Sequence, residues 1–212
     1  MLFVSYVINI NFVAEMLEKI LEGCDKLFRK FGIKSLSMDD IARELGMSKK
    51  TIYQYVTDKN DLVKKTFSHI LNYNESQCTC IKDETDNPID EILLISRNMS
   101  QQMKGINPAV FYDLRKYHPE AWLLFENHSQ TFIYSQIKEN LTKGIQQGYY
   151  RDTIKADIIA RLYISLVQTI SNPELFSNID YDFSSVYHEM IKYHFNGICT
   201  EKGRDHFKTK IS

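Results

Sequence analysis

Apolar residues recur at every third or fourth position along almost the whole chain, and this spacing is the strongest constraint on its fold. The first example is the stripe over residues 17–31, where the spacing is that of one face of a helix. Only 8 glycines and 4 prolines interrupt the 212 residues, so the helices can be long. No strand-like alternation competes with this pattern. The sequence therefore predicts an all-α protein of roughly nine helices.

Glycines, prolines and capping residues divide the chain into its predicted helices. These helices cover residues 17–31, 37–45, 48–56, 58–80, 90–104, 108–116 and 119–147, followed by apolar stripes in residues 159–170 and 187–198. The polar, acidic stretch of residues 83–88 is the clearest break between them. We expect a small domain over residues 1–62 and a larger one over residues 63–212.

The first fourteen residues carry no charge and are mostly apolar. This stretch is too short to span a bilayer, and it lacks the basic start and the small-residue cleavage site of a signal peptide. We expect no membrane association. The segment is interpreted as an extension of the first helix, or as the product of an upstream start codon with Met16 as the alternative initiator.

Charge is unevenly distributed although the net charge is only -1. Residues 16–65 carry 11 Lys and Arg against 8 Asp and Glu, which gives this segment a charge of +3. Such a segment can dock on nucleic-acid phosphates if its cations share one face. The charge permits that function without proving it.

Residues 37–59 have the features of a helix-turn-helix. This motif needs a small residue where its helices cross, a glycine in the turn, and a second helix with one apolar and one polar face. Ala42 and Gly46 supply the first two, and Ser37 and Ser48 are suited to capping the helices. The inward-facing residues are predicted to be Ile41, Leu45, Ile52 and Val56. The outward-facing residues are predicted to be Lys49, Lys50, Tyr53 and Gln54.

An outward face of this composition suits the major groove of DNA. Lysine can neutralise phosphate or donate to guanine, glutamine can pair with adenine, and tyrosine hydroxyls can reach phosphates. A small helical bundle can also contain a capped polar helix after a glycine turn, so the short motif alone leaves that simpler interpretation open.

The longer pattern from Ile20 to Val63 resembles the N-terminal domain of TetR-family transcriptional regulators. The matching residues are Ile20-Leu21, Leu27-Phe28, Gly32, Ser37-Met38-Asp39-Asp40-Ile41-Ala42, Leu45-Gly46-Met47-Ser48, Thr51-Ile52-Tyr53, Tyr55, Asp58-Lys59 and Leu62. The resemblance implies a three-helix helix-turn-helix domain in residues 1–62, followed by a helical ligand-binding and dimerisation domain. It further implies DNA contacts by Ser48, Lys49, Lys50, Thr51, Tyr53 and Gln54, and a phosphate contact by Lys59.

The sequence departs from the family pattern at Lys50, where the family often has glycine, and at Val56, where it often has phenylalanine. Lys50 could therefore add a base or phosphate contact. Residues 1–14 also lack the basic arm that many family members carry, so minor-groove contacts from that end are not expected.

One helix-turn-helix contacts few phosphates, so a homodimer on a near-palindromic operator is expected. The resemblance places the dimer interface on the last two apolar stripes. The predicted interface residues are Ile159, Leu162, Leu166, Ile170, Tyr187, Met190, Ile191 and His194. Both stripes could equally be core within one chain, because periodicity does not distinguish the two cases.

Aromatic residues are concentrated in the middle of the chain, where family members enclose a small apolar or cationic effector. The predicted effector-pocket residues are Met103, Phe111, Tyr112, Trp122, Phe125, His128, Phe132 and Tyr163. Aromatic stripes of this kind are also common in ordinary cores. The resemblance implies a repressor that a bound effector releases from DNA; the effector itself cannot be read from the sequence.

Other functions find less support in the sequence. Cys78 and Cys80 could form a redox or metal pair, but they diverge by about 200° on a helix. The chain lacks nucleophile, phosphate-loop and metalloprotease motifs, so we expect no enzyme activity and no cofactor or metal. The four cysteines without CxxC spacing favour reduced thiols and a cytoplasmic location. An all-helical interaction or ligand-binding protein with a vestigial helix-turn-helix remains the alternative.

Overall fold

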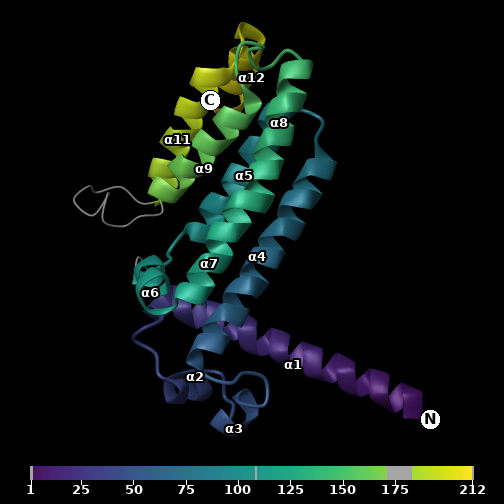
Figure 1. Ribbon diagram of the computed structural model, residues 1–212, viewed down its shortest axis with the longest axis vertical. Helices are drawn as coiled ribbons and strands as arrows, with labels where there is room; N and C mark the ends of the chain where they lie inside the picture. Colours follow the sequence, from purple (N-terminus) through teal and green to yellow (C-terminus); the bar gives the residue numbers. More distant parts are fainter. Residues whose placement is uncertain (1, 108, 171–182, 212) are drawn as a thin grey trace. The chain divides into compact units, whose positions relative to one another are not determined.

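The computed structural model describes residues 2–107, 109–170 and 183–211, and the side chains of residues 1–12 and 211 are outside that description (Figure 1). The described residues are almost entirely helical, with one isolated bridge between Tyr150 and Cys199 and no strand. The predicted all-α class is therefore confirmed. No helix among the described residues is long and apolar enough to cross a membrane.

The chain forms two compact units. Unit 1 consists of Met1–Asn72 and Gly105–Phe125, and unit 2 of Tyr73–Lys104 and Glu126–Ser212. This division differs from the boundary expected after residue 62, because the first part of a long helix and a later segment of the chain both pack into unit 1. Each unit has its own hydrophobic core.

Unit 1 contains α1 (Leu2–Phe31), α2 (Met38–Glu44), α3 (Lys49–Ile52), the first part of α4 (Lys59–Glu84), α6 (Ala109–Tyr117) and the start of α7 (Pro119–His128). The apolar stripe of α1 enters the core through Ile20, Cys24 and Phe28. Gly32 ends α1 in the left-handed region at φ 79°. The uncharged N-terminal stretch is helical and continuous with α1, which agrees with the predicted helix extension.

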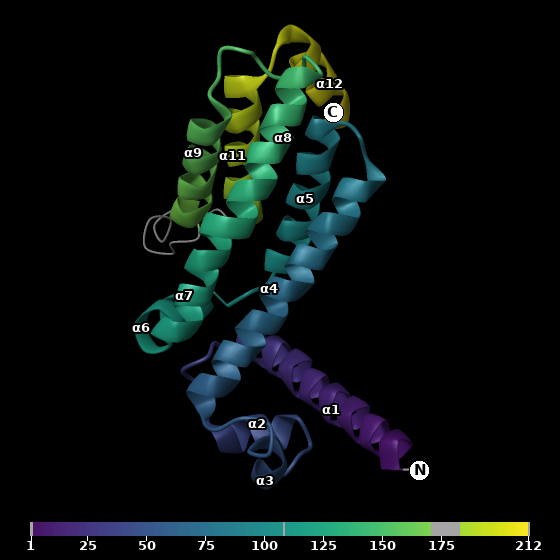
Figure 2. The ribbon, with the colours of Figure 1, turned by 45° about the vertical axis from the view of Figure 1, so that its right-hand side comes forward.

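Unit 2 contains the second part of α4, α5 (Pro88–Met103), the end of α7, the π-helical turn η1 (Ser129–Ile133), α8 (Tyr134–Gln146), α9 (Ala156–Ile170), α11 (Phe183–Ile198) and α12 (Glu201–Ile211). Helices α5, α8, α9 and α11 lie side by side in this unit (Figures 1 and 2). The buried rings of Tyr150 and Phe195 lie in its core, with their centroids 6.4 Å apart.

Several predicted helix bounds need correction. The helix expected over residues 48–56 ends at Ile52 and continues only as turns. The helix expected over residues 119–147 contains the π-helical turn η1 at its middle. Helix α12 was not predicted, since Phe207 is the only buried apolar side chain among those that the structure describes in this helix. Pro108, expected to begin a helix, lies outside the described residues; the helix there starts at Ala109.

Candidate nucleic-acid interface

A reciprocal capping box fixes the start of α2. The Ser37 Oγ accepts a hydrogen bond from the Asp40 backbone N at 3.2 Å, and the Ser37 backbone N donates to the Asp40 Oδ2 at 3.0 Å. The Ser37 hydroxyl, the Ser37 backbone N–H and the Arg43 guanidinium all donate to this carboxylate, which lowers the pKa of Asp40 to about 2. The predicted Ser37–Asp40 cap is confirmed.

Gly46 and Ser48 build the turn between α2 and α3. Gly46 ends α2 at φ 64°, a left-handed conformation that glycine adopts without strain, and the Met47 N donates to the Ala42 carbonyl at 2.9 Å. The Ser48 Oγ then accepts from the Thr51 N at 3.0 Å and so caps α3. These local bonds set the direction in which α3 leaves the turn.

The inner face of the two helices is the predicted miniature core. Ile41 and Ile52 are fully buried, and Ala42 and Val56 are nearly so. Leu45 is half-buried, with its side chain against Gly23 of α1. Burial of this face fixes which side of α3 remains outside.

The outer face of α3 presents cations and hydrogen-bonding groups. Lys49, Lys50, Tyr53 and Gln54 are all exposed. Lys49 pairs with Asp39 at 3.1 Å, whereas neither Lys50 nor Gln54 has a polar partner within the part of the chain that the structure describes. The hydroxyls of Ser48 and Thr51 lie 2.8 Å apart. Such a face can exchange its weak surface contacts for phosphate oxygens and base edges.

Lys59 lies differently from the expected phosphate ligand. Its ammonium donates to the carbonyl oxygens of Ile33, at 2.7 Å, and Leu36, at 2.5 Å. Burial lowers the pKa of Lys59. The side chain therefore holds the loop after α1 against α4. These two carbonyl oxygens occupy the ammonium group and so compete with a phosphate for the same donor.

A distant residue completes this loop. The Asp113 carboxylate of α6 accepts from the backbone N of Ile33 at 3.0 Å and of Lys34 at 2.8 Å. Asp113 is 5% exposed, and 79 or 80 positions separate it from its partners. The sequence offered no signal for this role, because nothing local marks Asp113 as a partner of the loop.

Comparison with known proteins supports the interpretation of this unit. Residues 20–66 match the model of bacterial regulatory proteins of the tetR family. The chain is 26% identical over 192 residues to the HTH-type transcriptional regulator YvaF of Bacillus subtilis, covering 89% of this chain and 98% of YvaF. Residues 20–66 are therefore similar to the helix-turn-helix domain of the tetR family, and the similarity to a transcriptional regulator extends over most of the chain.

Two further similar proteins extend the comparison. It is 20% identical over 158 residues to the HTH-type transcriptional repressor KstR2 of Mycobacterium tuberculosis, covering 68% of this chain and 73% of KstR2. The solved structure of FadR from Bacillus subtilis, in complex with stearoyl-CoA, has a TM-score of 0.66 at 15% identity and covers 85% of this chain and 98% of FadR. At that identity the second match concerns the fold.

The residues predicted to form the effector pocket are distributed over both units. Unit 1 contains Phe111, Tyr112, Trp122 and Phe125, and unit 2 contains Met103, His128, Phe132 and Tyr163. In unit 1 the rings of Trp122 and Phe125 lie 5.3 Å apart. In unit 2 the rings of His128 and Phe132 stack at 5.3 Å, and the ring of Tyr163 is buried.

Unit 2 contains a hollow between α4 and α5 that sequence reasoning did not locate. Its cavity volume is about 20 Å³, roughly the room that one water molecule needs. Its lining residues are Asn74, Gln77, Cys78, Ile81, Ile95, Asn98, Met99 and Gln102. The residues recur at helical spacing on two facing helices, a pattern that could not be recognised before the pairing of α4 with α5 was known.

Buried polar groups surround the same part of unit 2. The Asn74 Oδ1 and the Glu91 Oε2 are buried without a hydrogen-bond partner among the described residues. Burial raises the pKa of Glu91, and it raises the pKa of the Cys78 thiol to about 11. A thiol with this pKa stays protonated at neutral pH, which argues against the redox and metal pair considered for Cys78 and Cys80.

The predicted dimer residues fall into two groups. Tyr187, Met190, Ile191 and His194 of α11 are 8% exposed or less, so they form the core of unit 2 and offer little surface to another chain. Ile159, Leu166 and Ile170 of α9 are half-buried, whereas Leu162 is 54% exposed. The apolar side chains left outside are Ile158, Leu162 and Tyr193, which sequence periodicity did not separate from the core.

Proposed function

We propose that this TetR-family transcriptional regulator represses its target genes by binding a near-palindromic operator as a homodimer, through the outer face of α3. The observation that carries the proposal is the exposed set of Lys49, Lys50, Tyr53 and Gln54 on a helix whose direction two serine caps and a left-handed glycine fix. Ser48 and Thr51 extend this set. Operator binding in bacteria implies a cytoplasmic location.

We assign no direct phosphate contact to Lys59. Its ammonium would have to leave two carbonyl oxygens to reach DNA, and an unsatisfied buried carbonyl costs about 1–3 kcal/mol. Lys59 thus acts as a positioning residue for the loop that precedes α2.

The test is fluorescence anisotropy of the full-length protein on its own upstream DNA and on a shuffled duplex, titrated through salt. We expect specific, salt-sensitive binding that saturates at one dimer per site. Lys50→Ala should lower the salt slope by about 1 if the side chain contacts a phosphate, and Gln54→Ala should cost about 1–3 kcal/mol at one base position only. Tyr53→Ala should weaken all sequences alike.

Lys155→Ala is the matched control, because Lys155 is an exposed lysine of unit 2. It should leave the binding curve and the salt slope unchanged. Equal binding of wild type, Lys50→Ala and Gln54→Ala to every duplex recovered by unbiased site selection would refute the assignment of α3. It would favour the alternative of an interaction protein with a vestigial helix-turn-helix.

For dimerisation we propose the outer faces of α9 and α11. Exposed apolar side chains on adjacent helices are typical of association surfaces, and Leu162 and Tyr193 are 54% and 74% exposed. Leu162→Glu should shift the sedimentation coefficient from that of a dimer to that of a monomer and abolish cooperative operator binding. Glu substitution at the exposed Val13 of α1 is the control, and an unchanged dimer in Leu162→Glu would exclude this surface.

For the effector we propose the hollow between α4 and α5. FadR holds stearoyl-CoA, and the buried Oδ1 of the lining residue Asn74, which has no hydrogen-bond partner among the described residues, favours a ligand that brings a hydrogen-bond donor. At about 20 Å³ the hollow is far smaller than the roughly 300–1,000 Å³ of ordinary ligand pockets, so effector binding would have to widen it. Since α4 also packs in the core of unit 1 through Leu62 and Val63, its displacement would alter the helix-turn-helix.

The effector proposal is tested by screening small apolar and cationic compounds for release of the protein from its operator. Met99→Trp fills the hollow and should reduce the response to an active compound while leaving operator affinity unchanged. Leu123→Trp, at an exposed position of α7, is the control. An undiminished response in Met99→Trp would place the effector elsewhere.

A further inference from the structure

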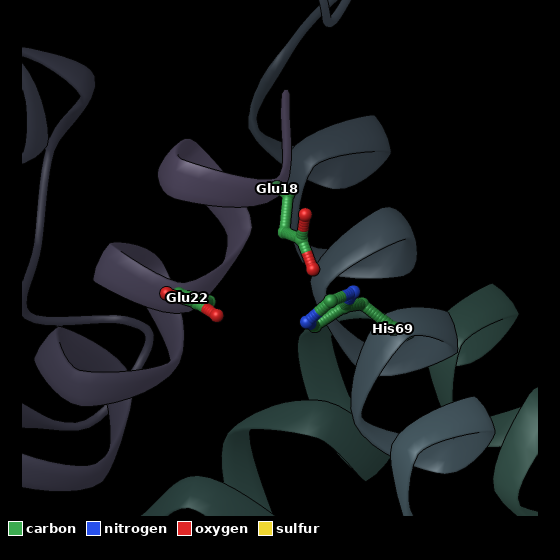
Figure 3. Close-up of side chains that lie close together, drawn as sticks. All are labelled: Glu18, Glu22 and His69. Carbon is green, nitrogen blue, oxygen red and sulfur yellow. The ribbon is translucent and has the colours of Figure 1, made fainter. Parts of the chain in front are cut away.

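Three side chains of types that can bind a metal converge on a surface of unit 1 to which no function has been assigned above. Glu18 and Glu22 lie one turn apart on α1, and His69 faces them from α4 (Figure 3). One carboxylate oxygen of each glutamate and one ring nitrogen of His69 all lie within 4.8 Å of one another. The i, i+4 spacing places both glutamates on the same face of α1.

The surroundings leave this cluster without a counter-charge. In the portion of the chain that the structure covers, neither glutamate forms an ion pair and His69 forms no hydrogen bond, although the chain has many surface lysines that pair elsewhere. Two carboxylates that lie this close repel one another, and a divalent cation held between them and the imidazole would relieve that repulsion. Both glutamates are exposed and His69 is half-exposed, so an ion in solution can reach all three.

The donor set selects a class of ion. One imidazole nitrogen and two carboxylate oxygens, with positions left for water, match the three-protein-ligand sites of Zn²⁺ and similar first-row divalent ions. Ca²⁺ prefers six to eight oxygen ligands, and Mg²⁺ does not favour imidazole. Zinc bonds of about 2.0–2.2 Å require the three ligand atoms to move closer together, which rotation of the glutamate side chains permits.

We propose that Glu18, Glu22 and His69 form a Zn²⁺-class binding site that clamps α1 to α4 within unit 1. The site goes beyond operator and effector binding, because it uses none of the residues assigned to either. An ion held only by the folded arrangement stabilises that arrangement. The clamp joins the two helices that form the core of unit 1 with α2 and α3.

The experiment uses chelator-treated, fully reduced full-length protein and Zn²⁺ alone. Isothermal titration should give one ion per chain, and Zn²⁺ should raise the melting temperature. His69→Ala should weaken binding by at least tenfold and remove the thermal shift, and Glu18→Gln with Glu22→Gln should do the same if the His69 variant fails to fold. His188→Ala and Glu44→Gln, at exposed positions outside the cluster, are the matched controls and should bind as wild type does.

Cobalt identifies the ligand atoms. Co²⁺ bound at this site should show d–d absorption without a thiolate-to-cobalt charge-transfer band, and His69→Ala should lose that absorption. A thiolate band would overturn the proposal, because it would place the ion on cysteines such as the exposed Cys80. Equal Zn²⁺ affinity in wild type and His69→Ala would overturn it too, as would the absence of Zn²⁺ binding to the folded wild type. Operator binding is not measured here, so neither result depends on the proposed repressor function.

Discussion

The two units differ in how their polar groups find partners. In the helix-turn-helix of unit 1, Ser37 bonds Asp40 and Ser48 bonds Thr51, each three residues away. In unit 2 the buried Asn140 donates to the carbonyl of Pro88, 52 positions away, and the hydroxyls of Tyr163 and Tyr187 pair across 24 positions. Local partners specify the recognition element, whereas the second unit depends on contacts that only folding brings together.

Asp113, like Lys59, has distant partners within unit 1, and its removal should have the largest effect. Asp113→Ala leaves two backbone N–H groups, those of Ile33 and Lys34, without their acceptor. The bond from the Ile33 N–H is buried and that from the Lys34 N–H is partly buried, and an unsatisfied buried donor costs about 1–3 kcal/mol, so we expect a loss of about 3 kcal/mol in the free energy of unfolding, measured by urea denaturation at fixed protein concentration. Asp113→Asn keeps one acceptor oxygen and should lose less than half as much. Equal stability of wild type and Asp113→Ala would mean that the local caps of unit 1 suffice.

Gly144 tests the packing of unit 2. A Cβ at this position of α8 would lie 2.0 Å from the buried ring of Tyr150, whose hydroxyl bonds Asn140 and so resists displacement. Overpacking costs about 1–3 kcal/mol, which exceeds the gain of roughly 1 kcal/mol in helix propensity. Gly144→Ala should therefore lower the free energy of unfolding by up to about 2 kcal/mol after both effects.

Gly197→Ala is the matched control in the same unit, because nothing lies within 4 Å of a Cβ at this position of α11. It should stabilise the protein by up to about 1 kcal/mol through helix propensity. If both alanine variants changed stability alike, the close approach of Tyr150 to α8 would not be a determinant of unit 2.

His194 tests the packing of unit 2 through the pH dependence of the free energy of unfolding. Burial lowers the pKa of His194 from its ordinary value of 6.5 to about 4, so the folded state binds this proton more weakly than the unfolded state. The stabilisation is complete above pH 6.5 and decreases as the pH falls toward 4. Between pH 7.5 and pH 5 we expect His194 to cost about 2 kcal/mol of the free energy of unfolding.

The readout for His194 is the difference in pH dependence between wild type and His194→Gln. The difference is needed because burial also lowers the pKa of His118 and His128, which add to the same trend. A His188→Gln control, at an exposed position, should keep the wild-type slope. Identical slopes in wild type and His194→Gln would show that His194 titrates normally in the folded protein.

The smallest effect is expected at the capping box. Ser37→Ala removes the acceptor for the Asp40 N–H and should cost about 1 kcal/mol in the free energy of unfolding. It also removes the hydroxyl donor to the Asp40 carboxylate, one of the groups that hold the pKa of Asp40 at about 2, below its ordinary value of 3.8. That contribution is present above pH 3.8 and lost as the pH falls toward 2, so wild type and Ser37→Ala should converge in stability in acid. Ser35→Ala, just outside the box, is the control, and parallel acid curves for wild type and Ser37→Ala would contradict this origin of the pKa.

The helix-turn-helix could be predicted from the sequence because its signals lie within a few residues of one another. The caps at Ser37 and Ser48, the turn at Gly46 and the buried face of Ile41 and Ile52 all follow from local rules. Lys59 could not be predicted, since its partners are carbonyl oxygens 23 and 26 positions earlier in the chain.

For unit 2 the sequence predicted most of the helices, but little about how they pack. Periodicity identified α9 and α11 as apolar, but did not distinguish the buried Tyr187 from a residue at a dimer surface. Helix α12 was not predicted because its packing depends on one described ring, that of Phe207, whose centroid lies 4.8 Å from that of Phe195. The hollow between α4 and α5 requires two helix faces whose pairing no single stretch of sequence encodes.

The sequence by itself determined the all-α class, the order of most helices and the exposed recognition face, because capping, glycine turns and apolar spacing act over three or four residues. Only the tertiary structure decided which α11 side chains are core, where unit 2 is hollow, that Lys59 and Asp113 hold the loop after α1, and that Glu18, Glu22 and His69 converge. These features depend on which helix faces meet, and the free energy of that packing is shared among residues far apart in the chain.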